Sequence, residues 1–234
     1  MKLELCAASL EAIKLAKEFS FDRIELCQTL EQGGLTPSPG MIEYALAYGL
    51  EVHVLIRPRP GGFMYDQDEI EIILRDIRES KSIGAHGVVI GSLDDSGLID
   101  KTSLNLMVEQ ADGMDVTFHR AFDDTFDHEK SLDVLLEAGV TRVLSSGLAS
   151  NVELGTPILK QMKEYVGTQL EIMPGGGVNA SNVGNLINEI KPDAVHFSGT
   201  SKYLLDENSM FSESILKVDQ QKVKRLLEEI AKVT

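Results

Sequence analysis

Two cysteines stand at matching places in the chain, because the tripeptide Glu-Leu-Cys ends once at Cys6 and again at Cys27. Thiolate sulfur is a soft ligand that selects Cu(I) or Zn over Mg or Ca. If the tripeptides end neighbouring strands, whose axes lie ~4.8 Å apart, both sulfurs can reach one metal ion at ~2.3 Å. A pair without a fixed third ligand suits Cu(I) better than tetrahedral Zn. The alternative interpretation is two small side chains that only fill the core.

Ionisable side chains occur near the ends of several other apolar runs. Histidine is the residue type that titrates near neutrality, so His119 and His196 are expected to transfer protons, and Glu4 and Glu25 are predicted to serve beside them as general bases. No spacing selects one reaction, so isomerase, lyase and hydrolase chemistry all stay open. A second set is predicted to bind a small anionic substrate, and it consists of Arg57, Arg59, Arg120, Asp123, Gly175, Gly176, Gly177 and Ser198.

The elements that must position these residues follow a regular alternation. Runs rich in Val, Ile and Leu alternate with helix-length amphipathic stretches, which is typical of βα units around a parallel sheet. Eight such units in 234 residues predict a TIM (β/α)8 barrel, and no linker divides the chain, so residues 1–234 are expected to form one domain. The predicted strands span residues 2–6, 22–27, 51–57, 86–90, 114–119, 141–145, 169–173 and 193–198.

Strand alternation predicts which side chains face the barrel axis. Outward side chains lie under helices and must be apolar, whereas inward ones become polar only near the open carboxyl end. Burying an unpaired ion costs several kcal/mol, so the inward charges are expected to share a solvated site at the mouth. The alternative for Glu4 and Glu25 is a structural pairing with Arg57 and Arg59. His53, nearer the closed end, is expected to be a core imidazole with satisfied hydrogen bonds.

The glycine run after the seventh strand indicates an anion site. Gly175 to Gly177 precede a helix that is predicted to begin near Ala180, so their backbone N–H groups are expected to be free for an anion. Barrels often bind phosphate in the loops after strands seven and eight, and Ser198 would supply the other half. Two long connections, Arg57 to Asp68 and Tyr203 to Leu216, have the length of lids or contact surfaces.

Composition excludes several classes of partner. The net charge is −15 and no basic run is present, which argues against nucleic acid. No apolar run approaches the ~20 residues that span a bilayer, and the first residues lack the apolar core of a signal peptide. We therefore expect a cytoplasmic protein with no membrane contact, in which both cysteines are free thiols.

Several motifs together resemble the CutC family over about residues 1–200. They are MKLELCAAS, FDRIELC followed by GGLTPS, IRPRPGGFMY, GVVIGSL, VTFHRAFD, RVLSSG, IMPGGGV and VHFSG, in this order. The resemblance implies a TIM barrel, a cytoplasmic role in copper homeostasis, Cu(I) binding at Cys6 and Cys27, and a homo-oligomer, either dimer or tetramer. The chain departs from the common family pattern RPRGGDF, since Arg57 begins RPRPGGF here and the acidic residue is missing.

Two hypotheses of function remain from the sequence. The first is a copper-binding protein whose paired cysteines hold Cu(I) at the barrel mouth. The second is an enzyme acting on a small anionic, phosphorylated or carboxylated metabolite, which alone gives a reason for the arginines and the glycine run. A non-catalytic scaffold is the weakest alternative, because it leaves the inward charges unexplained.

Overall fold

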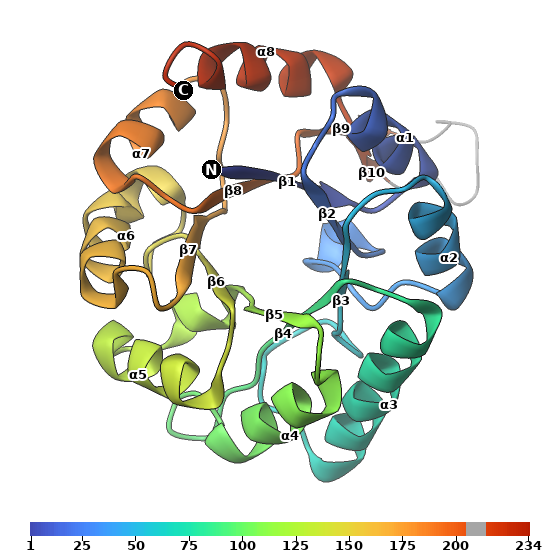
Figure 1. The fold of residues 1–234 in the computed structure, drawn as a ribbon, viewed down its shortest axis with the longest axis vertical. Coiled ribbons are helices and arrows are strands. Elements are labelled where there is room, and N and C mark those ends of the chain that lie inside the picture. The colour runs from blue at the N-terminus through green and yellow to red at the C-terminus, as the bar shows by residue number, and fades with distance from the viewer. Residues whose placement is uncertain (205–213) are drawn as a thin grey trace.

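Eight parallel strands form the inner wall of a barrel and helices surround it (Figure 1). The structure is a computed structural model that describes residues 1–204 and 214–234. Strands neighbour one another in chain order, and Asp193 N donates to Ile172 O at 3.2 Å where β7 meets β8. The predicted TIM barrel is confirmed. The strands are β1 (Lys2–Ala7), β2 (Arg23–Leu26), β3 (Val52–Leu55), β4 (Gly87–Ile90), β5 (Asp115–Phe118), β6 (Arg142–Ser145), β7 (Glu171–Pro174) and β8 (Ala194–Phe197).

The helices follow the strands as the alternation predicts. Their starts are set by local sequence: Asp66 and Glu69 form a reciprocal capping box at α3, and Ser9 accepts from Ala12 N at α1. None of the described helices is long and apolar enough to cross a bilayer. The helices are α1 (Leu10–Glu18), α2 (Pro39–Ala47), α3 (Gln67–Ile83), α4 (Lys101–Ala111), α5 (His128–Ala138), α6 (Val152–Val166), α7 (Val183–Ile190) and α8 (Gln220–Ile230).

The main hydrophobic core lies between the strands and the helices. Alternate residues such as Leu5, Ile24 and Val54 are fully buried there, and the inward positions carry the polar side chains. The predicted alternation is therefore correct for these strands. Inside the barrel, Leu144, Met173 and Ala194 form a smaller apolar cluster, so the lower barrel is packed with side chains.

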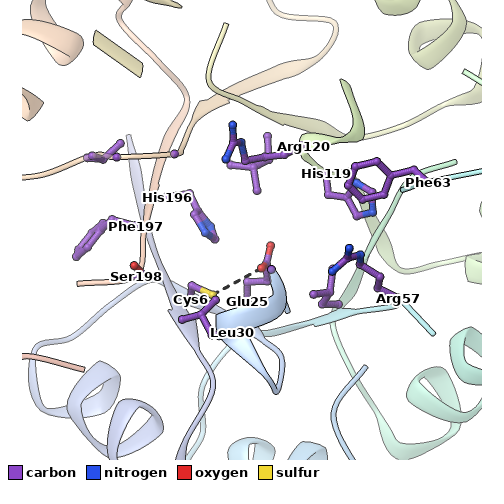
Figure 2. A pocket seen from close by; sticks show the side chains of 16 residues that line it. Cys6, Glu25, Leu30, Arg57, Phe63, His119, Arg120, His196, Phe197 and Ser198 are labelled. Atoms are coloured by element: carbon purple, nitrogen blue, oxygen red, sulfur yellow. Dashed lines mark hydrogen bonds between the residues drawn. The ribbon is translucent and has the colours of Figure 1, made fainter. Parts of the chain in front are cut away.

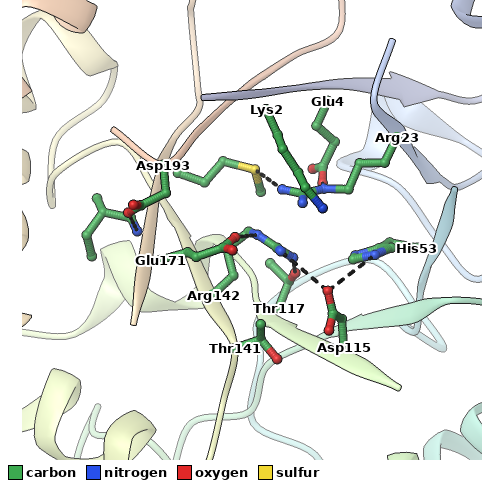
Figure 3. Close-up of polar contacts among 12 residues, drawn as sticks. Lys2, Glu4, Arg23, His53, Asp115, Thr117, Thr141, Arg142, Glu171 and Asp193 are labelled. Carbon is green, nitrogen blue, oxygen red and sulfur yellow. Dashed lines mark hydrogen bonds and ion pairs between the residues drawn. The ribbon is translucent and has the colours of Figure 1, made fainter. Parts of the chain in front are cut away.

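Two arginines that lie inside the barrel are not among the residues predicted to face its axis. Arg23 on β2 and Arg142 on β6 are fully buried, and each is paired with a carboxylate. Arg23 forms an ion pair with Glu4, while Arg142 donates to Glu171 at 2.6 Å and to the Thr117 hydroxyl at 2.9 Å (Figure 3). The alternative interpretation, a pairing of Glu4 with Arg57 or Arg59, is wrong, because Arg23 supplies the cation from the neighbouring strand.

The two long connections differ in what the structure describes. The first, after β3, includes Arg59, which forms an ion pair with Glu69 of α3. In the second, β9 (Thr200–Leu204) pairs antiparallel with β10 (Ser214–Val218), and Leu216 N donates to Glu31 at 2.6 Å. Residues 205–213, the middle of the predicted Tyr203 to Leu216 segment, lie outside the described residues.

Candidate functional site

A cavity of about 370 Å³ opens at the carboxyl ends of the strands (Figure 2). In that view His196, Cys6 and Glu25 lie close together, and Arg57, His119 and Phe63 gather to one side of them. The lining residues are Cys6, Glu25, Leu30, Gly33, Leu55, Arg57, Phe63, His119, Arg120, Leu144, Gly176, Gly177, Val178, His196, Phe197 and Ser198.

The two cysteines are side by side at the ends of β1 and β2. Their sulfurs are 3.7 Å apart, both side chains are buried, and both thiols are free. The hydrogen bond to Cys27, followed by burial, raises the pKa of the Cys6 thiol well above its usual value. Cys6 therefore keeps its proton at neutral pH until a ligand replaces it. Cys6 lines the cavity, whereas Cys27 lies one layer behind it.

Cys6, Glu25 and His196 together form a cluster of three possible metal ligands. One ligand atom from each lies within 4.8 Å of the other two. The Cys6 thiol donates to Glu25 Oε1 at 3.8 Å, and Glu25 Oε2 has no hydrogen-bond partner in the described parts of the chain. Burial raises the pKa of Glu25. These three side chains, and not the cysteine pair alone, make up the polar floor of the cavity.

Glu4 holds His196 in place from below. Its Oε1 lies 2.7 Å from His196 Nδ1, so the ring carries a proton there and its Nε2 is left for a ligand. Burial acts to lower the pKa of His196, but the attraction of Glu25 and the Glu4 hydrogen bond outweigh it, so the pKa is raised. His196 and Arg23 hold the pKa of Glu4 far below its usual value against the effect of burial. Glu4 does not line the cavity, so its role there is positioning.

His119 presents a nitrogen to the other side of the cavity. Its Nδ1 accepts from Ala121 N at 3.1 Å, while its Nε2 has no partner in residues 1–204 and 214–234. Burial and the nearby Arg57 charge lower the pKa of His119 to about 3. The neutral ring therefore carries its proton on Nε2, and His119 is a hydrogen-bond donor rather than a cation.

Arg57 brings an unneutralised positive charge to the cavity wall. Its guanidinium donates to the carbonyl oxygens of Gln32 and Gly34 at 2.9 Å and of Gly61 at 2.7 Å. The side chain is buried, no carboxylate of the described chain lies within 4.0 Å of it, and its Nε is unpartnered. A buried cation without a counter-ion attracts an anion.

Three of the predicted substrate-binding residues do not line the cavity. Arg59 points toward α3, where Glu69 and the carbonyl of Met64 hold it, so it does not converge with Arg57 as expected. Asp123 accepts from Arg120 Nε at 2.8 Å and from Ser145 Oγ at 2.6 Å, which makes it a support for the loop after β6. Gly175 extends the strand ladder by donating to Ser145 O at 2.9 Å.

Gly176 and Gly177 do line the cavity, and the expected helix follows them at a later start. The helix α7 begins at Val183, not near Ala180. Gly176 has φ of +98° and would place a Cβ 3.0 Å from Arg120 Cζ, so glycine allows the Arg120 guanidinium to lie flat against the loop. Ser198 also lines the cavity, and its part in binding an anion stays a prediction.

The apolar part of the cavity wall was not predicted from the sequence. Phe63 packs on the His119 ring with centroids 4.8 Å apart, and Arg57 lies 5.3 Å from the centroid of Phe63. Leu30 comes from the short 3-10 helix η1 (Leu30–Gln32). Both residues are on loops, where strand alternation says nothing about direction, and only the long connection after Arg57 pointed toward this region.

The fold and these side chains define a class: a TIM-barrel protein with a thiol, a carboxylate and two imidazoles at its carboxyl mouth. The CutC family model matches residues 1–201, and the chain belongs to this family. A CutC protein of Glaesserella parasuis is 39% identical over 99% of both chains. One from Enterococcus faecalis is 40% identical over 82% of this chain and 96% of its own.

Solved structures agree with this assignment. The CutC structure from Streptococcus agalactiae superposes with a TM-score of 0.80 at 33% identity, covering 84% of this chain and 98% of that one. Phosphoribosylanthranilate isomerase from Pyrococcus furiosus superposes with a TM-score of 0.59 at 14% identity over the full length of both chains. The second likeness shows a shared barrel fold and nothing about activity.

Proposed function

We propose that this protein binds Cu(I) at the barrel mouth as its cargo, through the paired thiols of Cys6 and Cys27, with His196 beside Cys6. The name of the Streptococcus agalactiae relative refers to copper homeostasis. The observation that carries the proposal for this chain is the pair of buried free thiols, 3.7 Å apart, with Cys6 opening onto the cavity. Thiolates select Cu(I) among the available ions.

The sulfur spacing supports a bent arrangement with at least one further ligand. Two sulfurs ~2.3 Å from one ion lie about 4.6 Å apart if the arrangement is linear, about 4.0 Å apart if it is trigonal and about 3.8 Å apart if it is tetrahedral. The observed 3.7 Å is far from the linear value and close to the other two. A ring nitrogen of His196 lies within 4.8 Å of the Cys6 sulfur, and Glu4 occupies Nδ1, so His196 Nε2 is the further ligand that a small movement toward the thiols would supply.

Glu25 provides a place for the protons that the metal displaces. Cu(I) binding breaks the S–H bonds of both cysteines and releases two protons. The Cys6 thiol already donates to Glu25 Oε1, and the proton of Cys27 follows by way of the Cys6 sulfur, 3.7 Å away. Burial raises the pKa of Glu25, so this carboxylate is a better proton acceptor than an exposed one. Each proton then leaves to solvent through the open cavity.

Anaerobic titration of Cu(I) against a chromophoric chelator tests this proposal. The wild-type protein is expected to take up one Cu(I) per chain, and Cys6→Ala with Cys27→Ala is expected to abolish uptake. His196→Gln should weaken binding while Ser198→Ala, on the same cavity wall, should not. Unchanged uptake by the double cysteine variant would exclude the proposed site.

A cytoplasmic location belongs to the same proposal. Two unbridged thiols in van der Waals contact are expected to persist only in a reducing compartment. Assembly into a dimer or tetramer, which the family resemblance implies, remains a prediction that light scattering on the purified protein would test.

A second function is favoured by one specific observation, the unneutralised Arg57. An enzyme for a small anionic metabolite would use Arg57 to hold the anion, His119 Nε2–H to donate to it, and Glu25 or His196 to move a proton. Inorganic phosphate serves as the probe in calorimetry. Arg57→Met should abolish phosphate binding, whereas Arg59→Met should leave it unchanged; equal affinities would remove the support for this function.

A further inference from the structure

A second cluster of ligand-type side chains lies at the opposite end of the strands from the cavity. His53 is the second residue of β3, Glu51 immediately precedes that strand, and Asp115 is the first residue of β5. One ligand atom from each lies within 4.8 Å of the other two. None of them lines the mouth cavity, so neither function proposed above uses them.

The imidazole of His53 is unsatisfied, contrary to the expectation of a core histidine. The side chain is fully buried, and neither ring nitrogen has a hydrogen-bond partner among residues 1–204 and 214–234. Its Nε2 is 3.3 Å from Glu51 Oε1, without hydrogen-bond geometry. The same nitrogen is 3.9 Å from Asp115 Oδ2, which is beyond hydrogen-bond distance (Figure 3). The ring therefore faces the space between two carboxylates.

The distances match those around a shared ion. Two ligand atoms ~2.1 Å from one tetrahedral metal lie about 3.4 Å apart. The observed 3.3 and 3.9 Å separations need only small side-chain adjustments to meet that value. Gly87 leaves room for the ring in this orientation, since a Cβ there would lie 2.8 Å from His53 Cε1 and Nδ1.

The local charges favour a cation despite two basic neighbours. Lys2 Nζ lies 3.4 Å from Glu51 Oε1, and Arg142 Nη2 lies 3.5 Å from Asp115 Oδ2. Both contacts are long, and Arg142 has its stronger partner in Glu171 at 2.6 Å. The carboxylates are those of Glu51, Asp115 and Glu171. Together with the two cations they give the cluster a net charge of −1 when His53 is neutral. The half-exposed carboxylates also give an ion an entry path from solvent.

We propose that Glu51, His53 and Asp115 bind a divalent transition-metal ion, with Zn(II) as the suitable probe, at the amino end of the barrel. One imidazole and two carboxylates suit Zn(II), and a fourth position is left for water. This end of a TIM barrel serves stability rather than catalysis, so the ion would tie β3 to β5.

Zinc content after equilibrium dialysis tests the site in a Cys6→Ala, Cys27→Ala background, which removes the thiolates of the mouth. This background is expected to retain one Zn(II) per chain and to gain thermal stability from it. Asp115→Asn and Glu51→Gln, both at half-exposed positions, should each weaken binding at least tenfold. Asp193→Asn is the matched control, because it removes a carboxylate of the same barrel end that pairs with Lys163 and not with His53 or Arg142.

Three results would overturn the proposal. The first is that the thiol-free background binds no stoichiometric Zn(II). The second is that the double variant Asp115→Asn, Glu51→Gln in this background binds Zn(II) with unchanged affinity. The third is that Glu25→Gln and not Asp115→Asn abolishes binding, which would place the ion at the mouth. His53→Gln is a further test with circular dichroism to verify folding, and the two carboxylate variants decide the question if it does not fold.

Discussion

The two ends of the barrel use similar residue types under opposite conditions. At the mouth, Cys6, Glu25 and His196 are all buried, and Glu4 and Arg23 hold the imidazole from beneath. At the amino end, His53 is buried but its two carboxylate neighbours are half-exposed, and its Nδ1 has no hydrogen-bond partner within the described ranges. The mouth is therefore an internally supported site, whereas the amino end depends on solvent-facing groups that an ion could organise.

The largest effect is expected from removing the support of the mouth. Glu4→Gln leaves the Arg23 charge buried without a counter-ion, which costs roughly 3–5 kcal/mol in free energy of unfolding. Glu51→Gln at the amino end breaks a half-exposed pair with Lys2 and should cost less than ~1 kcal/mol. Urea denaturation measures both values, and equal losses would contradict the contrast between the two ends.

The next effect concerns pH and His119. Because burial and Arg57 lower its pKa to about 3 in the folded protein, the unfolded chain binds a proton first as the pH falls below about 6.5. This residue should therefore destabilise the fold on acidification from pH 6.5 toward 3, by up to ~1.4 kcal/mol per pH unit.

His119→Asn keeps an acceptor for Ala121 N and removes the titration. The variant should lose less stability than the wild-type protein between pH 6.5 and 4.5, as measured by urea denaturation at each pH. His86→Asn is the control, since His86 is exposed and also accepts a backbone hydrogen bond. A His119→Asn profile parallel to that of the wild-type protein would show that His119 is protonated in the folded state.

A smaller effect is expected on the reactivity of Cys6. The Glu25 carboxylate contributes to the raised pKa of this thiol, after the Cys27 hydrogen bond and burial. Glu25→Gln should increase alkylation of Cys6 by iodoacetamide at pH 8 by roughly two- to tenfold, because more thiolate forms. Peptide mass spectrometry follows the modification, and Asp115→Asn, at the other end, should not change it.

The smallest effect is expected from the competing cation at the amino end. Lys2→Met frees Glu51 Oε1 from a long, half-exposed contact. Zn(II) affinity of the thiol-free background should rise by roughly two- to fivefold, as expected for the loss of a weak surface pair. Competition with a chelator measures the change, and weaker binding would mean that Lys2 does not oppose the ion.

Strand alternation predicted much of the mouth from sequence. It placed Cys6, Glu25 and His196 inward because their neighbours Leu5, Leu26 and Phe197 had to lie under helices. Such a pattern works wherever one face of a strand is sealed by apolar packing. The same reasoning could have found Arg23 and Arg142, which share the inward side with Glu25 and Leu144 at the starts of their strands.

The errors fall where alternation no longer applies. Arg59 lies beyond the end of β3, next to Pro58 and Pro60, so its direction depends on the loop and on Glu69 rather than on the strand. One of the two carboxylates beside His53 belongs to Glu51, which lies outside any strand of the structure. Phe63 and Leu30 reach the cavity from connections whose course depends on long-range contacts.

Arg57 couples two connections of the barrel that are separate in sequence. Its guanidinium donates to the carbonyl oxygens of Gln32 and Gly34 after β2 and of Gly61 after β3. One side chain therefore holds both connections. Neither connection can shift without stretching the same three bonds. A ligand in the cavity that contacts the Arg57 side chain would consequently stiffen both rims of the opening at once, which links occupancy of the barrel to the order of its entrance.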